Sequence, residues 1–296
     1  GAVSLRLEML QVARLAPTLL QSSADLVGGF FRERYDPAGG FTNRAGLPDL
    51  YYTVFGLEGM AALQAPIDAD RTRAYLAGFG DGAALDFVHL SCLARCWANL
   101  PDGVPPADVR RRMLDRVATF RAGDGGFATD PGGDEGSAYG AFVAIGAYQD
   151  LREPVPDSDA LMAQLLTLIA ADGGLNNFPG APVGLTTATA AAAAALRQFG
   201  EPVPATFGPW LLSQAHPQGG FRALPGSPIP DLLSTATAIH ALVGLHADIS
   251  AVKEPCLDFI DSLWTNRGGF YGHWEDDILD CEYTYYGLLA LGHLSL

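Results

Sequence analysis

Carboxylate, imidazole, thiol and phenol groups occur together at the starts of three apolar segments of this 296-residue chain. They are Asp49, Tyr51 and Tyr52 at the first start, Asp86 and His89 at the second, and Asp280, Cys281 and Glu282 at the third. Carboxylate, imidazole and thiolate groups are metal ligands, and a carboxyl group in an apolar pocket can act as a proton donor. Asp is also a preferred helix N-cap residue, so a chemical role depends on whether the fold brings these starts together.

An internal repeat indicates how the chain positions these groups. Gly-Gly followed by Phe or Leu recurs with first glycines at Gly39, Gly125, Gly173, Gly219 and Gly268. The last three intervals are 48, 46 and 49 residues, and the first, 86 residues, is about twice as long. A degenerate copy, Gly80-Asp81-Gly82, stands inside that long interval. A fixed period of this length is typical of repeat architectures, and it predicts six units.

Each unit combines a polar helix, the Gly-Gly turn, a loop and an apolar helix. Gly permits a positive φ after a helix end, and the Phe or Leu that follows is expected to pack as a plug. The apolar helices are predicted at Leu50–Leu63, Phe87–Leu100, Ala138–Tyr148, Thr186–Leu196, Leu232–Leu245 and Cys281–Leu294. The polar helices, such as Val109–Phe120, keep a charged face and are expected outside. Strand patterns are absent, so we expect one all-α domain over residues 1–296 with twelve helices in six hairpins.

Composition excludes several classes of partner. The net charge is −15 and the sequence pI is about 4.6, which argues against a nucleic acid or an anionic membrane surface as the main partner. No apolar stretch reaches the roughly 20 residues of a transmembrane segment, and residues 1–20 do not resemble a signal peptide. The four cysteines show no disulfide-scaffold spacing. A cytoplasmic protein is therefore expected.

The repeats "GGF…PDLYYTVFGL", "GGLNNFPG…TTATAAAAAL" and "GGFYGHWEDDILDCEYTYYGLLALG" resemble those of the prenyltransferase β-subunit and squalene-cyclase superfamily. The resemblance covers roughly residues 10 to 296. It implies a closed (α/α)6 toroid whose inner helices line a central apolar funnel. It also implies that the chemistry lies where the inner helices begin.

Units one and two resemble the zinc-bearing units of protein prenyltransferase β-subunits, which carry Asp-x-Cys at one inner-helix start and Asp-x-x-His at the next. The resemblance implies that Asp49 and His89 are metal ligands, with Tyr51 in place of the cysteine. Zinc that activates a thiolate needs three protein ligands and one open position. A third ligand would have to come from Cys281 or Glu282 in the sixth unit. Further candidates are Cys92 and Cys96.

The same resemblance implies that Arg44 and Tyr52 contact an isoprenyl diphosphate, although the lysine usual in the family is missing. Eukaryotic relatives act with a helical α-subunit, so a protein partner of that kind is a further expectation. Aromatic side chains on or beside the inner helices suit a prenyl chain or a carbocation. Of these, Tyr51, Trp274 and Tyr283 are candidate substrate contacts.

The sixth unit suggests a different reaction. Asp280-Cys281 resembles the start of the acid motif of oxidosqualene cyclases, and Asp280 to Thr284 matches the position of the Asp-x-Asp-Asp-Thr motif of bacterial squalene and class II diterpene cyclases. The resemblance implies Asp280 or Glu282 as a proton donor. Asp276-Asp277-Ile278-Leu279-Asp280 is also a literal DDxxD sequence, which binds magnesium in class I terpene synthases, where it lies inside a helix.

Three hypotheses follow. The first is metal-assisted transfer of a prenyl group from an isoprenyl diphosphate to a nucleophile such as a thiol. The second is acid-initiated cyclisation of a polyprenyl substrate. The third is a toroid without catalytic activity that binds a lipid or a protein segment.

Overall fold

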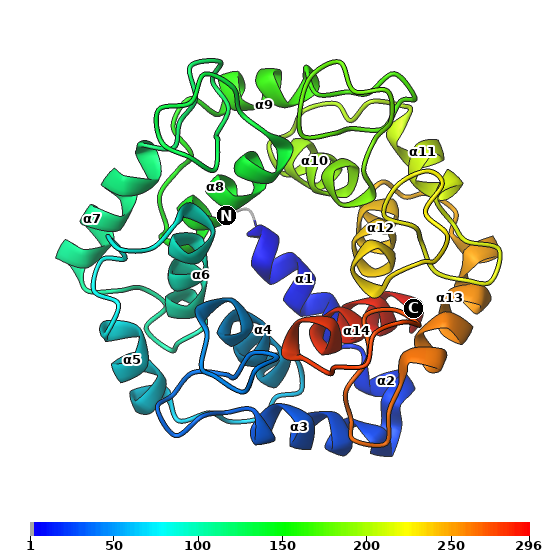
Figure 1. Ribbon diagram of the computed structural model, residues 1–296, viewed down its shortest axis with the longest axis horizontal. Coiled ribbons are helices and arrows are strands. Elements are labelled where there is room, and N and C mark those ends of the chain that lie inside the picture. The colour runs from blue at the N-terminus through cyan, green and yellow to red at the C-terminus, as the bar shows by residue number, and fades with distance from the viewer. Residues whose placement is uncertain (1–2) are drawn as a thin grey trace.

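The computed structural model describes residues 3–296, and within this range every regular element is a helix. Six helical hairpins form a closed ring (Figure 1). The inner helices are α4 (Leu50–Ala62), α6 (Phe87–Ala98), α8 (Ala138–Asp150), α10 (Thr186–Gln198), α12 (Leu232–Gly244) and α14 (Cys281–Leu294). The outer helices are α3 (Ala24–Glu33), α5 (Ala69–Ala77), α7 (Ala107–Ala118), α9 (Ser158–Leu166), α11 (Phe207–Ser213) and α13 (Ser250–Leu263). Because α14 packs against α4, the ring closes, and the predicted all-α toroid is confirmed.

Burial explains which helices lie inside. Helix α10 consists almost entirely of Ala, Thr and Leu, and most of its residues are buried, because other helices surround it. The outer helix α7 buries Met113, Leu114 and Val117 at helical spacing, while Arg111 on its other face is exposed. Packing of apolar faces supplies most of the stability of such helices.

The Gly-Gly turns join the two layers. Gly219 has a φ of 103°, and a Cβ atom there would lie 2.0 Å from the carbonyl oxygen of Pro255 on α13, so only glycine fits. Phe221 is fully buried, and its N–H donates to Thr235 Oγ1 at 2.9 Å. The equivalent bond joins Leu175 to Thr189 at 2.8 Å. The plug residue therefore fixes the start of the next inner helix.

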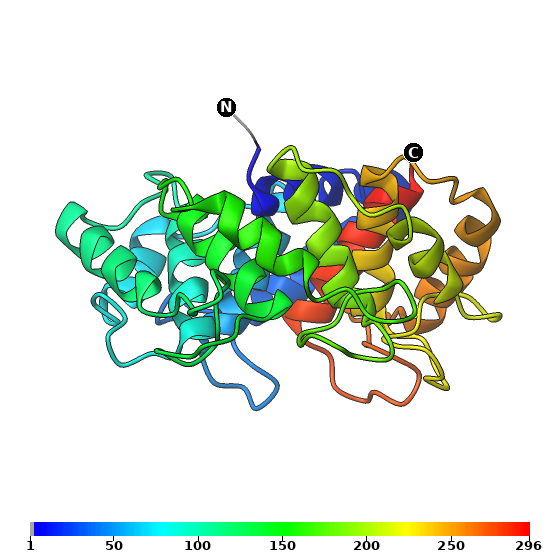
Figure 2. The same cartoon turned by 90° about the horizontal axis from the view of Figure 1, so that it is seen from above.

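The N-terminal segment adds a part that the six-hairpin prediction did not contain. Helix α1 (Leu5–Ala13), followed by α2 (Pro17–Leu20) and a 3₁₀ turn (Gln21–Ser23), crosses the ring at the end where the inner helices finish (Figures 1 and 2). It packs against α14, α4 and α8.

Helix α1 is held there by close contact and by charge. A Cβ atom at Gly292 would lie 2.0 Å from the carbonyl oxygen of Val12, so glycine is required for this approach. Arg6 pairs with Asp150 at 3.5 Å, and Glu8 contacts His240 at 3.1 Å. Helix α1 therefore forms a floor, and the opposite end, where the inner helices begin, is the mouth. None of the described helices is long and apolar enough to cross a membrane.

Candidate active site

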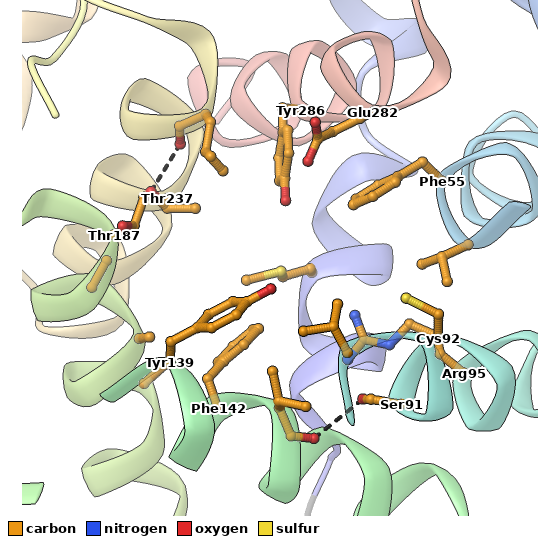
Figure 3. Close-up of a pocket in the computed structure, with 18 of the residues that line it drawn as sticks. Phe55, Ser91, Cys92, Arg95, Tyr139, Phe142, Thr187, Thr237, Glu282 and Tyr286 are labelled. Atoms are coloured by element: carbon orange, nitrogen blue, oxygen red, sulfur yellow. Dashed lines mark hydrogen bonds between the residues drawn. The ribbon is translucent and has the colours of Figure 1, made fainter. Parts of the chain in front are cut away.

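A cavity of about 280 Å³ lies inside the ring between the mouth and the α1 floor. Its walls are largely apolar side chains of the inner helices, and several are aromatic (Figure 3). The aromatic residues that line it are Tyr51, Phe55, Tyr139, Phe142, Tyr285 and Tyr286. This volume lies near the lower end of the range of about 300–1,000 Å³ that is typical of small-molecule sites. The cavity therefore suits a small, mostly apolar ligand.

Glu282 brings a carboxyl group into this apolar space near the mouth. It is the second residue of α14, it lines the cavity, and it is only 9% exposed. The hydroxyl of Tyr51 donates a hydrogen bond to Glu282 Oε2. Burial raises the pKa of Glu282 to about 7, although the Tyr51 hydrogen bond opposes the rise. The carboxyl group therefore retains its proton for a substantial share of the time near neutral pH.

Aromatic rings surround this acid. The rings of Tyr51 and Phe55 meet edge to face at 5.2 Å, and Phe55 and Tyr286 lie 5.4 Å apart. Tyr139 and Phe142 extend toward the cavity from α8 (Figure 3). Aromatic faces stabilise a nearby positive charge through the ring quadrupole, so the walls suit a carbocation.

Asp280 has a different role from Glu282, although both were candidate proton donors. Its Oδ1 accepts the N–H of Tyr283 at 2.8 Å and so caps α14, while its Oδ2 pairs with Arg44 at 2.7 Å. Burial raises the pKa of Asp280, but the Tyr283 hydrogen bond and Arg44 oppose the rise. Asp280 is not among the residues that line the cavity. It fixes the start of α14 and thereby positions Glu282.

The candidate diphosphate contacts are occupied by other partners or lie outside the cavity. Arg44 pairs with Asp276 at 2.8 Å as well as with Asp280, so two carboxylates neutralise its charge. Tyr52 does not line the cavity, and burial followed by the charge of Asp280 raises its pKa to about 12.

Two further candidates for substrate contact also face elsewhere. The Nε1 of Trp274 donates to Ser262 Oγ at 2.9 Å, and its ring packs on Phe259 of α13 at 5.6 Å. Tyr283 lies against Gly272 in the preceding loop. Neither Trp274 nor Tyr283 is a cavity-lining residue. Of the residues predicted to contact substrate, the cavity includes Tyr51 alone.

The predicted metal ligands do not fit a zinc site. Asp49 accepts from the N–H groups of Tyr51 and Tyr52 as the cap of α4, and His89 Nδ1 lies 2.8 Å from Asp86 Oδ1. Cys281 is fully buried and does not line the cavity, so its thiol packs in the core. Within residues 3–296, no three His, Cys, Asp or Glu side chains come close enough together to hold a metal ion. These residues therefore do not form a zinc site, and in the DDxxD sequence Asp276 and Asp280 are paired with Arg44.

A polar group that was not predicted from the sequence lies at the floor of the cavity. Glu58 of α4, Arg95 of α6 and His240 of α12 line this end. Each stands in the second half of a mostly apolar inner helix. A charged residue in such a helix is rarely buried without a partner, and that signal was available from the sequence.

Comparison with known proteins places the fold. The model of a family described as the prenyltransferase alpha-alpha toroid domain matches residues 19–92 and 187–295, which is more than half of the chain. No curated protein sequence matches significantly. The chain is similar in structure to protein geranylgeranyltransferase-I from Candida albicans complexed with GGPP, with 14% identity, a TM-score of 0.67, and coverage of 92% of this chain and 90% of that chain.

The apo structure of type II terpene cyclase MstE from Scytonema is also similar, with 14% identity and a TM-score of 0.63. Coverage is 94% of this chain and 98% of that chain. A variant of that cyclase, also at 14% identity, was solved with geranylgeranyl dihydroxybenzoate as substrate, with a TM-score of 0.62 and coverage of 95% and 97%. At such low identity these similarities establish the fold alone.

Proposed function

Because this chain belongs to the prenyltransferase alpha-alpha toroid family, we propose that its cavity binds an isoprenoid and that Glu282 starts the reaction by protonating it. The reaction is a cyclisation or rearrangement of the type II kind. The observation that supports this proposal is the carboxyl group of Glu282, which has a pKa of about 7 inside an apolar, aromatic cavity.

The chemistry follows from the surroundings of this acid. The π electrons of a terminal alkene take the proton, the O–H bond of Glu282 breaks, and a new C–H bond leaves a carbocation on the more substituted carbon. The carboxylate left behind keeps the hydrogen bond from Tyr51, and the rings of Phe55 and Tyr286 lie close together at the same site. A second alkene of the substrate then attacks the cation. Loss of a proton to the Glu282 carboxylate ends the reaction and restores the acid.

Charge at the mouth favours this reaction over prenyl transfer from a diphosphate. A diphosphate needs several uncompensated positive groups, but Arg44 is already paired with Asp276 and Asp280. Glu282 adds further negative charge when it ionises. An isoprenoid without a diphosphate is therefore the better substrate. The proposal also needs no helical partner subunit, because the acid and the aromatic walls come from this chain.

Single-residue variants test the proposal. We expect Glu282→Gln, which keeps the shape but has no acidic proton, to lower turnover of an isoprenoid substrate by about 10²–10⁴-fold, the usual contribution of a general acid. Tyr52→Phe, outside the cavity, is the control and should retain activity. Chelation of divalent metals should have no effect on turnover.

Zinc analysis separates this reaction from metal-assisted prenyl transfer. One zinc per chain that is lost in His89→Ala, together with release of diphosphate during turnover, would support prenyl transfer and contradict the proposal. Turnover that survives in Glu282→Gln would contradict it as well.

A further inference from the structure

The floor of the cavity carries a second polar group, remote from Glu282. Arg95 lies in the second half of α6, and Glu58 lies in the second half of α4, so both are far from the mouth. Helix α1 closes the cavity beneath them and contributes Met9 to its lining. Arg95 lies eight residues beyond the start of α6 at Phe87, which is about 12 Å deeper along the helix at 1.5 Å per residue. An extended ligand can reach both polar ends.

The guanidinium of Arg95 is only partly used by its protein partners. Its Nε donates to Asp150 Oδ2 at 3.2 Å and lies 3.8 Å from Glu58 Oε1. Among residues 3–296, neither terminal nitrogen of Arg95 has a hydrogen-bond partner. Figure 3 shows the guanidinium directed toward the cavity. Burial works to lower the pKa of Arg95, but the carboxylates of Asp150 and Glu58 outweigh it and hold the pKa above its ordinary value. Arg95 therefore offers charged donors to a ligand.

Glu58 offers an acceptor beside these donors. Its Oε1 accepts from Asn99 Nδ2 at 3.3 Å, while its Oε2 has no hydrogen-bond partner within the described part of the chain. Asn99 Oδ1 in turn accepts from Arg6 of α1 at 3.3 Å. A polar group that can both accept and donate would complete this end of the cavity.

The charges of the floor balance without a ligand. Arg95 and Arg6 supply two positive charges, and Glu58 and Asp150 supply two negative ones when they are ionised, with Arg6 and Asp150 3.5 Å apart. Burial raises the pKa of both carboxyl groups, and the charges of Arg95 and Arg6 oppose that rise. A buried charge is costly unless it is paired. A ligand with an anionic end would leave one negative charge without a partner, whereas a neutral hydroxyl would not.

We propose that the floor is a subsite for the hydroxyl end of an isoprenoid alcohol, with Arg95 donating to its oxygen and Glu58 accepting its proton. This inference rests on the proposed function, because it places the polar end at the floor and the terminal alkene near Glu282. The cavity volume of about 280 Å³ favours a short isoprenoid chain. Arg95 and Glu58 are thus specificity-determining residues.

Binding of three probes tests the subsite by calorimetry, in a Glu282→Gln background so that turnover plays no part. The probes are geraniol, geranic acid and geranyl diphosphate, which share a chain and differ at the end group. We expect geraniol to bind at least about tenfold more tightly than either anion, because an unpaired charge in a low-dielectric cavity outweighs a neutral hydrogen bond.

Changing one charge of the floor should reverse the preference. Glu58→Gln leaves one positive charge unpaired, so geranic acid should gain at least about tenfold relative to geraniol. Arg6→Gln changes the charge in the opposite sense and should weaken the binding of geranic acid further. This second variant provides the test if Glu58→Gln does not fold. Glu153→Gln, at the outer Arg110 pair, is the matched control and should leave the ratio unchanged.

These experiments can refute the floor subsite and the proposed reaction independently of each other. The subsite would be overturned if the Glu282→Gln protein bound geraniol and geranic acid with equal affinity. It would also be overturned if neither floor variant changed the ratio of these two affinities. Either result would stand even if turnover requires Glu282. Conversely, the predicted reversal together with turnover that does not need Glu282 would support the subsite and refute the proposed reaction.

Discussion

The raised pKa of Glu282 should make the unfolding free energy depend on pH, and this dependence can be measured without a substrate. The change is Glu282→Gln, which has nearly the same shape as the protonated carboxyl group. The pKa of Glu282 is about 7 in the folded chain, against an ordinary value of 4.5. Between these two pH values the unfolded chain has released the proton and the folded chain has kept it, so rising pH destabilises the fold.

Each pH unit between these two values costs about 1.4 kcal/mol, so the wild type should lose roughly 3 kcal/mol of unfolding free energy through this group. The loss begins near pH 4.5 and levels off above pH 7. Every other titrating group is shared by wild type and variant, so their difference isolates Glu282. We expect Glu282→Gln to be more stable than wild type at pH 8 by roughly 3 kcal/mol, relative to their difference at pH 4.

Urea denaturation at a series of pH values measures this difference. When the unfolding free energy is plotted against pH, the curves of wild type and Glu282→Gln should diverge from pH 4.5 to pH 7 and run parallel outside that window. Parallel curves throughout would mean that Glu282 titrates like an exposed carboxyl group. That result would refute the assignment of Glu282 as the proton donor.

Two further predictions concern the groups around this acid. Tyr51→Phe removes the hydrogen bond that lowers the pKa of Glu282, so that pKa should rise by roughly 1 unit. NMR of ¹³C-labelled glutamate carboxyls measures this pKa, and Tyr52→Phe should leave it unchanged. The same pKa in both variants would show that the Tyr51 hydrogen bond does not lower it. Arg44→Met leaves Asp280 buried without its ion pair and should lower the unfolding free energy by about 2 kcal/mol at pH 8 after discounting for the partial exposure of Arg44. Because burial raises the pKa of Asp280, the Arg44→Met effect should shrink as the pH falls and Asp280 becomes protonated. A loss of the same size at every pH would show that the ion pair is not its cause.

The fold could be predicted because its information is local and repeated. Each Gly-Gly turn ends one helix and aligns the next. Amino-acid composition is enough to distinguish the apolar helices from the polar ones. Caps such as Asp49 and Asp280 were expected from short-range chemistry and are present. The position of α1 could not be predicted, because its contacts are far apart in sequence. Glu8 of α1, for example, pairs with Arg197 of α10.

The site was predicted only in part, because helical rotation determines which side chains face the cavity. Asp280, Cys281 and Glu282 are consecutive, and successive residues of a helix point about 100° apart. Their spacing therefore indicates that the three side chains point in different directions, but it does not indicate which of them faces the cavity. The structure assigns the cavity to Glu282, the capping role to Asp280, and the buried packing to Cys281. The zinc prediction depended on three residues that each have a different local role.

If a proton from Glu282 starts the reaction, solvent deuterium must enter the product, so isotope incorporation tests the proposed function most directly. The protein is incubated in D₂O with a short isoprenoid alcohol and, in parallel, with the matching diphosphate, and the products are analysed by mass spectrometry and NMR. We expect a product of the alcohol that carries deuterium at the former terminal alkene and that is absent with Glu282→Gln. A product without deuterium at that carbon, or one formed only from the diphosphate with release of pyrophosphate, would contradict it.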